Sequence, residues 1–222
     1  MKHRALILFV ALLAGSLALD AGARAPEPAL AKWKAGTNYQ LLAAPQPTNV
    51  PAGKIEVAEV FWYGCGHCYA LDPALETWKT EKPAYVEFVR VPVIWGPMHR
   101  QHAKLYYILQ TLRRSDLHSK VFDAFHRQGL QLAARDEVVA RAEQLAFLVS
   151  QGVSEKEFNA AYDSMSVATN VMRAEDLTKK YAVASVPILI VNGKYSTSEG
   201  EAGGVPQLLS LITDLAASEK KN

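Results

Sequence analysis

Runs of apolar residues separated by turn-forming residues predict a set of short β-strands. Residues 55–63 combine β-branched and aromatic side chains with almost no polar interruption, and residues 85–91 are similar. Such runs are typical of strands that are covered on both faces of a sheet. Asn192-Gly193 is a strong signal for a tight hairpin turn between two strands. The predicted strands cover residues 39–42, 55–63, 85–91, 187–191 and 194–197.

The middle of the chain predicts a block of helices. Residues 98–186 contain no proline and only two glycines, Gly129 and Gly152. Apolar residues recur there every three or four positions, as they do on the buried face of an amphipathic helix. The four stripes are Leu105/Ile108/Leu109/Leu112, Leu117/Val121/Ala124/Phe125, Val138/Ala142/Leu145/Ala146/Val149 and Phe158/Ala161/Tyr162/Met165. A fifth helix is expected over roughly residues 167–181.

Two further helices flank this block in the sequence. Residues 67–79 follow the first long strand directly and have a helical pattern. Pro206 suits the first turn of the last helix. The apolar face of that helix carries Leu208, Leu211, Ile212 and Leu215. The element order predicts an α/β fold in which helices separate the second long strand from a C-terminal hairpin and helix.

The first residues have the pattern of an export signal. A short basic start at residues 2–4 precedes an uncharged apolar run over residues 5–19. This run is too short for a comfortable transmembrane span, and the small residues after it suit cleavage after Ala23 or, alternatively, Ala25. We expect residues 1–23 to be a signal peptide, with an uncleaved anchor as the alternative. The mature chain is then expected in the bacterial periplasm, where a cysteine pair can form a disulfide.

Composition narrows the class of protein without indicating its chemistry. The chain has 222 residues, 50% of them hydrophobic, and a formal net charge of +2. These values describe a globular protein with one or two cores. So small a charge provides no large basic field for nucleic acid. Two cysteines form at most one bridge, which excludes a small disulfide-stapled protein.

Cys65 and Cys68 form a Cys-x-x-Cys motif where a predicted buried strand meets a predicted helix. The first thiol then lies over free backbone N–H groups and the positive end of the helix dipole, which stabilise its thiolate. We expect Cys65 to be the exposed attacking thiol and Cys68, one turn into the helix, to be the resolving thiol. A protonated His67 would stabilise the thiolate further and make the disulfide more oxidising.

Other uses of this motif stay open. A zinc site would need two further ligands, for which only His99 and His102 are candidates. Haem attachment requires a histidine after the second cysteine, where this chain has Tyr69. An inert structural disulfide is the third alternative, although so short a loop provides little entropic stabilisation. We expect no metal and no cofactor.

Val186, Pro187 and Glu59 are further candidate site residues. Pro187 opens an otherwise apolar strand, where it is tolerated; it could mark a cis bond, although a trans proline is commoner. Glu59 lies in an apolar strand, where burial would raise its pKa and allow it to carry protons to or from Cys68. The alternative is a solvent-facing glutamate at the strand edge. Glu56, on the opposite strand face, is expected to be solvated.

The other histidines and aromatic clusters are expected to be structural. Aromatic residues at 61–63 and 106–107 are expected to lie in the core, although some of these rings could line a peptide groove. Solvated or packed positions are expected for the four histidines of the helical block, His99, His102, His118 and His126.

Two segments resemble those of a known family. Residues 59–69, EVFWYGCGHCY, resemble the active-site segment of the DsbA-type periplasmic dithiol oxidases of the thioredoxin superfamily. Residues 186–195, VPILIVNGKY, resemble the cis-proline segment of that family and the hairpin after it. The resemblance covers nearly all of the mature chain. It implies a reactive Cys65, a resolving Cys68, a cis Pro187 that contacts substrate and a buried acid at Glu59.

The resemblance also implies a function. The Cys65–Cys68 disulfide would be donated to newly exported, reduced proteins through a mixed disulfide at Cys65, and a DsbB-like membrane quinone reductase would restore it. We expect a monomer. An isomerase would usually need a dimerisation domain, and no separate N-terminal domain of that kind fits before residue 38. A disulfide isomerase or reductase of the same superfamily is the alternative enzyme. A noncatalytic, chaperone-like peptide-binding module is the alternative from another class.

Two residues depart from the family pattern. Gly66 stands where many members have proline, and the resulting Gly-His dipeptide is also typical of protein disulfide isomerases, which could make the redox potential milder. Pro83 occupies the approximate position where some members have a lysine near the buried acid. The resemblance therefore assigns no basic partner to Glu59.

The spacing of the motifs predicts the domain organisation. About 120 residues lie between Cys65 and Pro187, whereas a βα crossover needs only a dozen or more. We therefore predict a thioredoxin-like fold with an inserted helical domain. Residues 38–96 and 182–219 would form the thioredoxin-like domain, and residues 97–181 the helical insertion.

Overall fold

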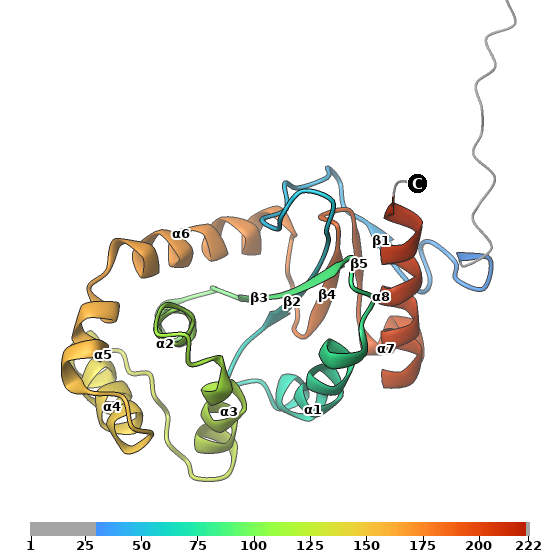
Figure 1. Cartoon of the computed structure of the whole chain (residues 1–222). Coiled ribbons are helices and arrows are strands. Elements are labelled where there is room, and N and C mark those ends of the chain that lie inside the picture. The colour runs from blue at the N-terminus through green and yellow to red at the C-terminus, as the bar shows by residue number, and fades with distance from the viewer. Residues whose placement is uncertain (1–29, 221–222) are drawn as a thin grey trace, which may run out of the picture.

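The computed structural model describes residues 30–220 (Figure 1). The predicted signal peptide, residues 1–23 with residue 25 as its alternative end, lies outside the described residues. Within them the sheet has five strands in the order β1-β5-β4-β2-β3. These strands are β1 Gln40–Leu41, β2 Ile55–Phe61, β3 Val86–Pro92, β4 Ile188–Val191 and β5 Tyr195–Thr197. Each predicted strand is confirmed, and no strand end differs from its predicted position by more than two residues.

Strand β2 lies in the interior of the sheet and determines which residues face one another. It pairs in parallel with β3, which places Glu59 opposite Arg90. It pairs antiparallel with β4, which places Val60 opposite Ile188. The order therefore brings the strand before the cysteines next to the strand that begins after Pro187.

The β4–β5 hairpin has the predicted two-residue turn. Asn192 and Gly193 both have positive φ angles, 50° and 63°, as a type I′ turn requires. A Cβ atom at position 193 would lie 2.1 Å from the carbonyl oxygen of Gln46. Position 193 therefore requires glycine, because its φ angle is positive and because there is no space for a side chain.

Helices α2 to α6 occupy the chain between β3 and β4, as the helical pattern predicts. In Figure 1 they lie beyond the β3 edge of the sheet, with α6 running back towards it. Within residues 30–220, no helix is long and apolar enough to cross a bilayer. The helices are α1 Gly66–Glu81, α2 Pro97–Thr111, the 3-10 turn η2 Ser115–Leu117, α3 His118–His126, α4 Glu137–Ser150, α5 Glu155–Tyr162, α6 Met165–Lys180, α7 Glu199–Ala202 and α8 Val205–Glu219. The short elements η2 and α7 were not predicted.

The sheet separates two hydrophobic cores. Val57 and Leu189 belong to a cluster that includes the buried faces of α1 and α8. Ala58 and Ile190, on the other face, belong to a cluster with residues of α2, α3 and α6. Because both faces are covered, every residue of β2 is buried. The structure confirms the α/β fold class and the doubly covered central strand.

The buried face of α4 differs from the prediction. The expected stripe, Val138, Ala142, Leu145, Ala146 and Val149, faces largely outward. The structure instead buries Gln144, Phe147 and Leu148. The side-chain N–H groups of Gln144 donate to the carbonyls of Gln101 and Leu132 at 3.1 and 2.8 Å, which offsets part of the cost of burying this residue. Its buried Oε1 has no hydrogen-bond partner among the described residues. A count of apolar residues alone assigns such a residue to the solvent.

Candidate active site

The two cysteines lie where β2 leads into α1. The helix begins at Gly66, so Cys65 is its N-cap residue, and Cys65 Sγ accepts the backbone N–H of Cys68 at 3.4 Å. Both residues are present as thiols. Cys68 is fully buried and Cys65 is partly exposed. One helical turn therefore holds one accessible and one buried thiol.

The surroundings drive the pKa values of these thiols apart. A hydrogen bond from the Cys68 thiol is the main cause that lowers the pKa of Cys65 from 9.0 to about 5. Backbone N–H groups of Cys68 and His67 and the charge of His67 lower it further, whereas partial burial opposes them. Burial raises the pKa of Cys68, and its hydrogen bond to Cys65 and the negative charge of Glu59 add to this effect. At neutral pH Cys65 is a thiolate and Cys68 a neutral thiol.

Val186 and Pro187 lie against the Cys65 sulfur. The peptide bond between them is cis, and the Val186 carbonyl oxygen is 3.4 Å from Cys65 Sγ. A cavity of about 580 Å³ lies beside them. Its other lining residues are His67, Ser185, Ser198, Glu199, Gly200, Gly203 and Gly204. The fold thus places an open groove next to the accessible thiol.

Glu59 is buried and forms an ion pair with Arg90. Its Oε2 atom accepts a hydrogen bond from Arg90 Nε at 2.7 Å. Burial raises the pKa of Glu59 to about 7, although Arg90 opposes the increase. Among the described residues, buried Oε1 has no hydrogen-bond partner. Glu59 therefore has a basic neighbour despite Pro83, because Arg90 of β3 lies directly opposite it in the sheet.

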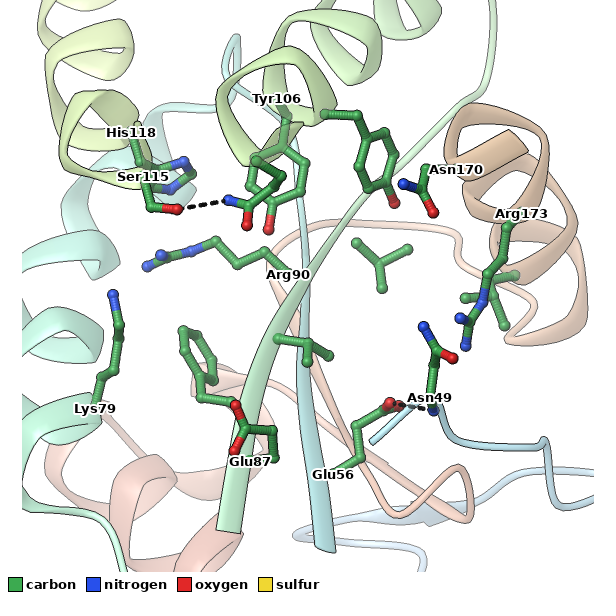
Figure 2. Close-up of a pocket in the computed structure, with 16 residues that line it drawn as sticks. Asn49, Glu56, Lys79, Glu87, Arg90, Tyr106, Ser115, His118, Asn170 and Arg173 are labelled. Atoms are coloured by element: carbon green, nitrogen blue, oxygen red, sulfur yellow. Dashed lines mark hydrogen bonds between the residues drawn. The ribbon is translucent and has the colours of Figure 1, made fainter. Parts of the chain in front are cut away.

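Arg90 joins Glu59 to two further carboxylates. Its Nη2 donates to Asp72 Oδ1 at 2.9 Å, and its Nη1 donates to Glu76 Oε1 at 2.8 Å. Figure 2 shows Arg90 and His118 on the wall of a cavity of about 400 Å³. A buried charge is costly unless it is paired and hydrogen-bonded. The three carboxylates meet that requirement for the guanidinium.

The prediction that Glu56 is solvated was wrong. Glu56 is only 4% exposed, and its Oε2 accepts the backbone N–H of Asn49 at 2.9 Å. Burial raises the pKa of Glu56, while Asn49 and Arg173 oppose the increase. Figure 2 shows these three residues together at one end of the cavity. The segment before β2 covers this residue, a contact that the strand pattern does not indicate.

The aromatic and histidine predictions are mostly confirmed. Phe61, Tyr63 and Tyr106 are buried. His102 Nε2 donates to the Gln131 carbonyl at 2.7 Å, and burial lowers the pKa of His102 to about 4. Residues 30–220 contain no group of three His, Cys, Asp or Glu side chains placed to hold a metal ion.

Comparison with known proteins identifies the family. No family model matches the chain. The thiol:disulfide interchange protein DsbA of Pseudomonas aeruginosa is 36% identical over 189 residues, which cover 85% of this chain and 86% of that protein. DsbA of Pseudomonas syringae pv. tomato is 37% identical over 218 residues, which cover 98% of this chain and 96% of that protein. The chain belongs to the DsbA family.

Solved DsbA structures agree with this assignment. The crystal structure of Pseudomonas aeruginosa DsbA matches this DsbA family member with a TM-score of 0.76 at 36% identity, covering 85% of this chain and 97% of that one. The DsbA oxidoreductase of Xylella fastidiosa matches with a TM-score of 0.75 at 26% identity, covering 83% and 96%. This DsbA family member is a thiol:disulfide oxidoreductase with a thioredoxin-like fold and an inserted helical domain, as predicted.

Sequence reasoning did not assign Arg90, Asp72, Glu76 or His118 to the polar network of this DsbA family member. Arg90 is a lone cation in an apolar strand, which could have indicated a buried ion pair. Asp72 lies four residues after Cys68 and therefore on the same face of α1. His118 carries no such signal, because its contact with Tyr63 joins residues that are far apart in the chain.

Proposed function

We propose that this DsbA family member oxidises pairs of thiols in newly exported, reduced proteins, with Cys65–Cys68 as its redox-active disulfide. The observation that carries the proposal is the opposite displacement of the two thiol pKa values within one helical turn. A stabilised thiolate at Cys65 favours the reduced form of the enzyme. A disulfide whose reduced form is stabilised is a stronger oxidant.

The reaction proceeds through a mixed disulfide. A substrate thiolate attacks Cys65 Sγ, the Cys65–Cys68 bond breaks, and Cys68 leaves as a thiolate that takes up a proton. A second substrate thiolate then attacks the substrate sulfur of the mixed disulfide, and Cys65 leaves as a thiolate. Two electrons pass from the substrate dithiol to the enzyme dithiol, and the substrate gains one disulfide.

Glu59 is proposed to exchange the proton of Cys68. Cys68 has a raised pKa, so its thiolate requires a proton as soon as it is released. Glu59 has a pKa of about 7, and its charge acts on Cys68. A carboxyl group with this pKa is protonated in a useful fraction of molecules at neutral pH.

Val186 and Pro187 are proposed to contact the substrate chain. They line a cavity, and the Val186 carbonyl oxygen is 3.4 Å from Cys65 Sγ, so a substrate bonded to this sulfur would lie close to them. Proline has no backbone N–H, so position 187 adds no donor that would compete for the thiolate. His67 lines the same cavity, and its proposed role is to stabilise the Cys65 thiolate by its positive charge.

The cellular setting is also a proposal. The basic start and apolar run of residues 2–19 support export to the periplasm. Reoxidation would pass two electrons to a DsbB-like membrane quinone reductase, and the protein would act as a monomer. The domain limits are proposed as 38–96 with 182–219 for the thioredoxin-like part and 97–181 for the insertion, since β3 ends at Pro92 and α6 ends at Lys180.

A redox titration against glutathione, combined with two serine variants, tests the proposal. The wild-type disulfide should be reduced by mild glutathione mixtures and should oxidise a dithiol peptide. Cys65→Ser should abolish oxidation. Cys68→Ser should accumulate a mixed disulfide between Cys65 and glutathione, formed when the Cys65 thiolate attacks oxidised glutathione and one glutathione thiolate leaves. A disulfide that resists reduction would indicate a reductase. Peptide binding without oxidation by the wild type would indicate a noncatalytic peptide-binding module.

A further inference from the structure

Helix α3 contacts the active-site segment on both sides of the cysteines. Tyr63 lies two positions before the first cysteine, and its backbone carbonyl accepts a hydrogen bond from His126 Nε2 at 2.8 Å. Tyr69 directly follows the second cysteine, and its hydroxyl donates to Asp123 Oδ1 at 2.7 Å. One helix of the insertion therefore restrains both ends of the cysteine motif.

His126 contacts both of these tyrosines. Phe122 also packs against both rings, but His126 adds a hydrogen bond to the Tyr63 backbone. A carbonyl oxygen only accepts hydrogen bonds, so His126 Nε2 carries a hydrogen. The imidazole also stacks on the Tyr69 ring, with ring centroids 4.7 Å apart and an angle of 6° between the planes. The side chain thus holds the backbone before Cys65 and the ring after Cys68 in one arrangement.

His118, at the other end of α3, holds the hydroxyl of Tyr63. Burial lowers the pKa of His118 to about 4, so its ring is neutral at pH 7. Its Nε2 faces Asp72 Oδ1 at 3.4 Å. Its Nδ1 shares a hydrogen bond of 2.9 Å with the Tyr63 hydroxyl. Tyr63 is therefore held by α3 at its hydroxyl and at its carbonyl.

Gly64 joins Tyr63 to Cys65, and its backbone must be held in place by neighbouring contacts. A Cβ atom at Gly64 would lie 2.4 Å from the Trp62 ring, so a side chain does not fit there. Glycine leaves the backbone free to adopt many conformations. The hydrogen bond from the Cys68 N–H to Cys65 Sγ, at 3.4 Å, depends on the orientation of this connection, since hydrogen bonds weaken steeply with poor geometry.

We propose that His126 is a positioning residue for the Cys65 thiolate. It holds the Tyr63 carbonyl and the Tyr69 ring, and it thereby keeps Cys65 Sγ over the backbone N–H groups at the start of α1. The proposal rests on the role of Cys65 proposed above. It assigns a redox effect to a histidine for which the sequence indicates only a solvated or packed position.

The test compares His126→Ala with His126→Gln. Alanine removes the hydrogen bond and the stacked ring, so the Cys65 pKa should rise, and the equilibrium with glutathione should shift ~2- to 10-fold towards the enzyme disulfide, the range expected for one lost hydrogen bond. Glutamine keeps an N–H donor of similar reach, so its equilibrium should return to within about twofold of the wild-type value. The Cys65 pKa is followed by thiolate absorbance, which requires no substrate.

A matched control separates positioning from stability. Val121 is a fully buried residue of α3 that makes none of these hydrogen bonds, so Val121→Ala should lower the free energy of unfolding and leave the Cys65 pKa unchanged. Equal pKa values in wild type and His126→Ala would overturn the proposal, as would equal shifts in His126→Ala and Val121→Ala. So would a glutamine variant no different from alanine. A wild-type Cys65 with an ordinary pKa would instead refute the proposed function, and the positioning role with it.

Discussion

Acidification should remove the stability advantage that the Cys65 thiolate confers on the reduced protein. The pKa of Cys65 is lowered from 9.0 to about 5 in the folded state. A group with a depressed folded pKa stabilises the fold fully above its unfolded pKa, and this contribution is lost as the pH falls through the folded value. The window here runs from about pH 9 down to about pH 5. The oxidised protein has no thiol at this position and lacks the contribution.

The magnitude at neutral pH follows from the same values. At pH 7 the solution is 7 − 5 = 2 pH units above the folded pKa, and each unit corresponds to about 1.4 kcal/mol. The upper limit is therefore about 2.8 kcal/mol. Cys65 is partly exposed, so solvent screening reduces the expected contribution to about 1–2 kcal/mol. At about pH 4 the contribution should be close to zero.

Denaturant unfolding of both redox forms at about pH 7 and about pH 4 measures this contribution, from the midpoint and slope of each transition. The free energy of unfolding of the reduced form minus that of the oxidised form should rise by about 1–2 kcal/mol between the two pH values. The disulfide's effect on the unfolded chain is independent of pH and cancels in this comparison. Cys68 is also a thiol only in the reduced form, but its raised pKa keeps it protonated over this pH range. The remaining ionisable groups are present in both forms and cancel to first order. A difference that does not change with pH would refute the stabilised thiolate.

Three further changes have defined outcomes. His67→Ala should raise the Cys65 pKa only slightly, because the charge of His67 contributes less to lowering this pKa than the hydrogen bonds to the sulfur do; thiolate absorbance measures this, and a return to about 9 would contradict it. In the wild type the free energy of unfolding should fall as the pH rises from about 4.5 to about 7, because the folded pKa of Glu59 is raised to about 7. Glu59→Gln should remove this fall. Urea midpoints that fall equally with pH in both proteins would contradict the prediction. Gly193→Ala should lower the free energy of unfolding by roughly 1–3 kcal/mol, because φ is 63° and the new Cβ would meet the Gln46 carbonyl; a neutral effect in thermal melts would contradict the strained turn.

Local patterns in the sequence were sufficient for the elements and for the reactive motif. The apolar runs predicted all five described strands, and Asn192-Gly193 predicted the hairpin, because strand burial and turn conformation depend on neighbouring residues. Cys65 and Cys68 were assigned from their place between a strand and a helix, where free N–H groups are always present. The resemblance of residues 59–69 to the DsbA active site added the family and its chemistry, which comparison of the whole chain supports.

Only the tertiary structure decided which distant residues meet at the site. Strand register, not composition, placed Arg90 opposite Glu59, and helix packing placed His126 on the carbonyl of Tyr63. The same holds for Gln144, whose burial in α4 depends on two carbonyls from other segments. A periodic pattern indicates which side chains face the interior, but it contains no information on which residues they contact there. Hydrogen bonds between residues far apart in the chain require angstrom-level placement, which arises only when all elements pack together.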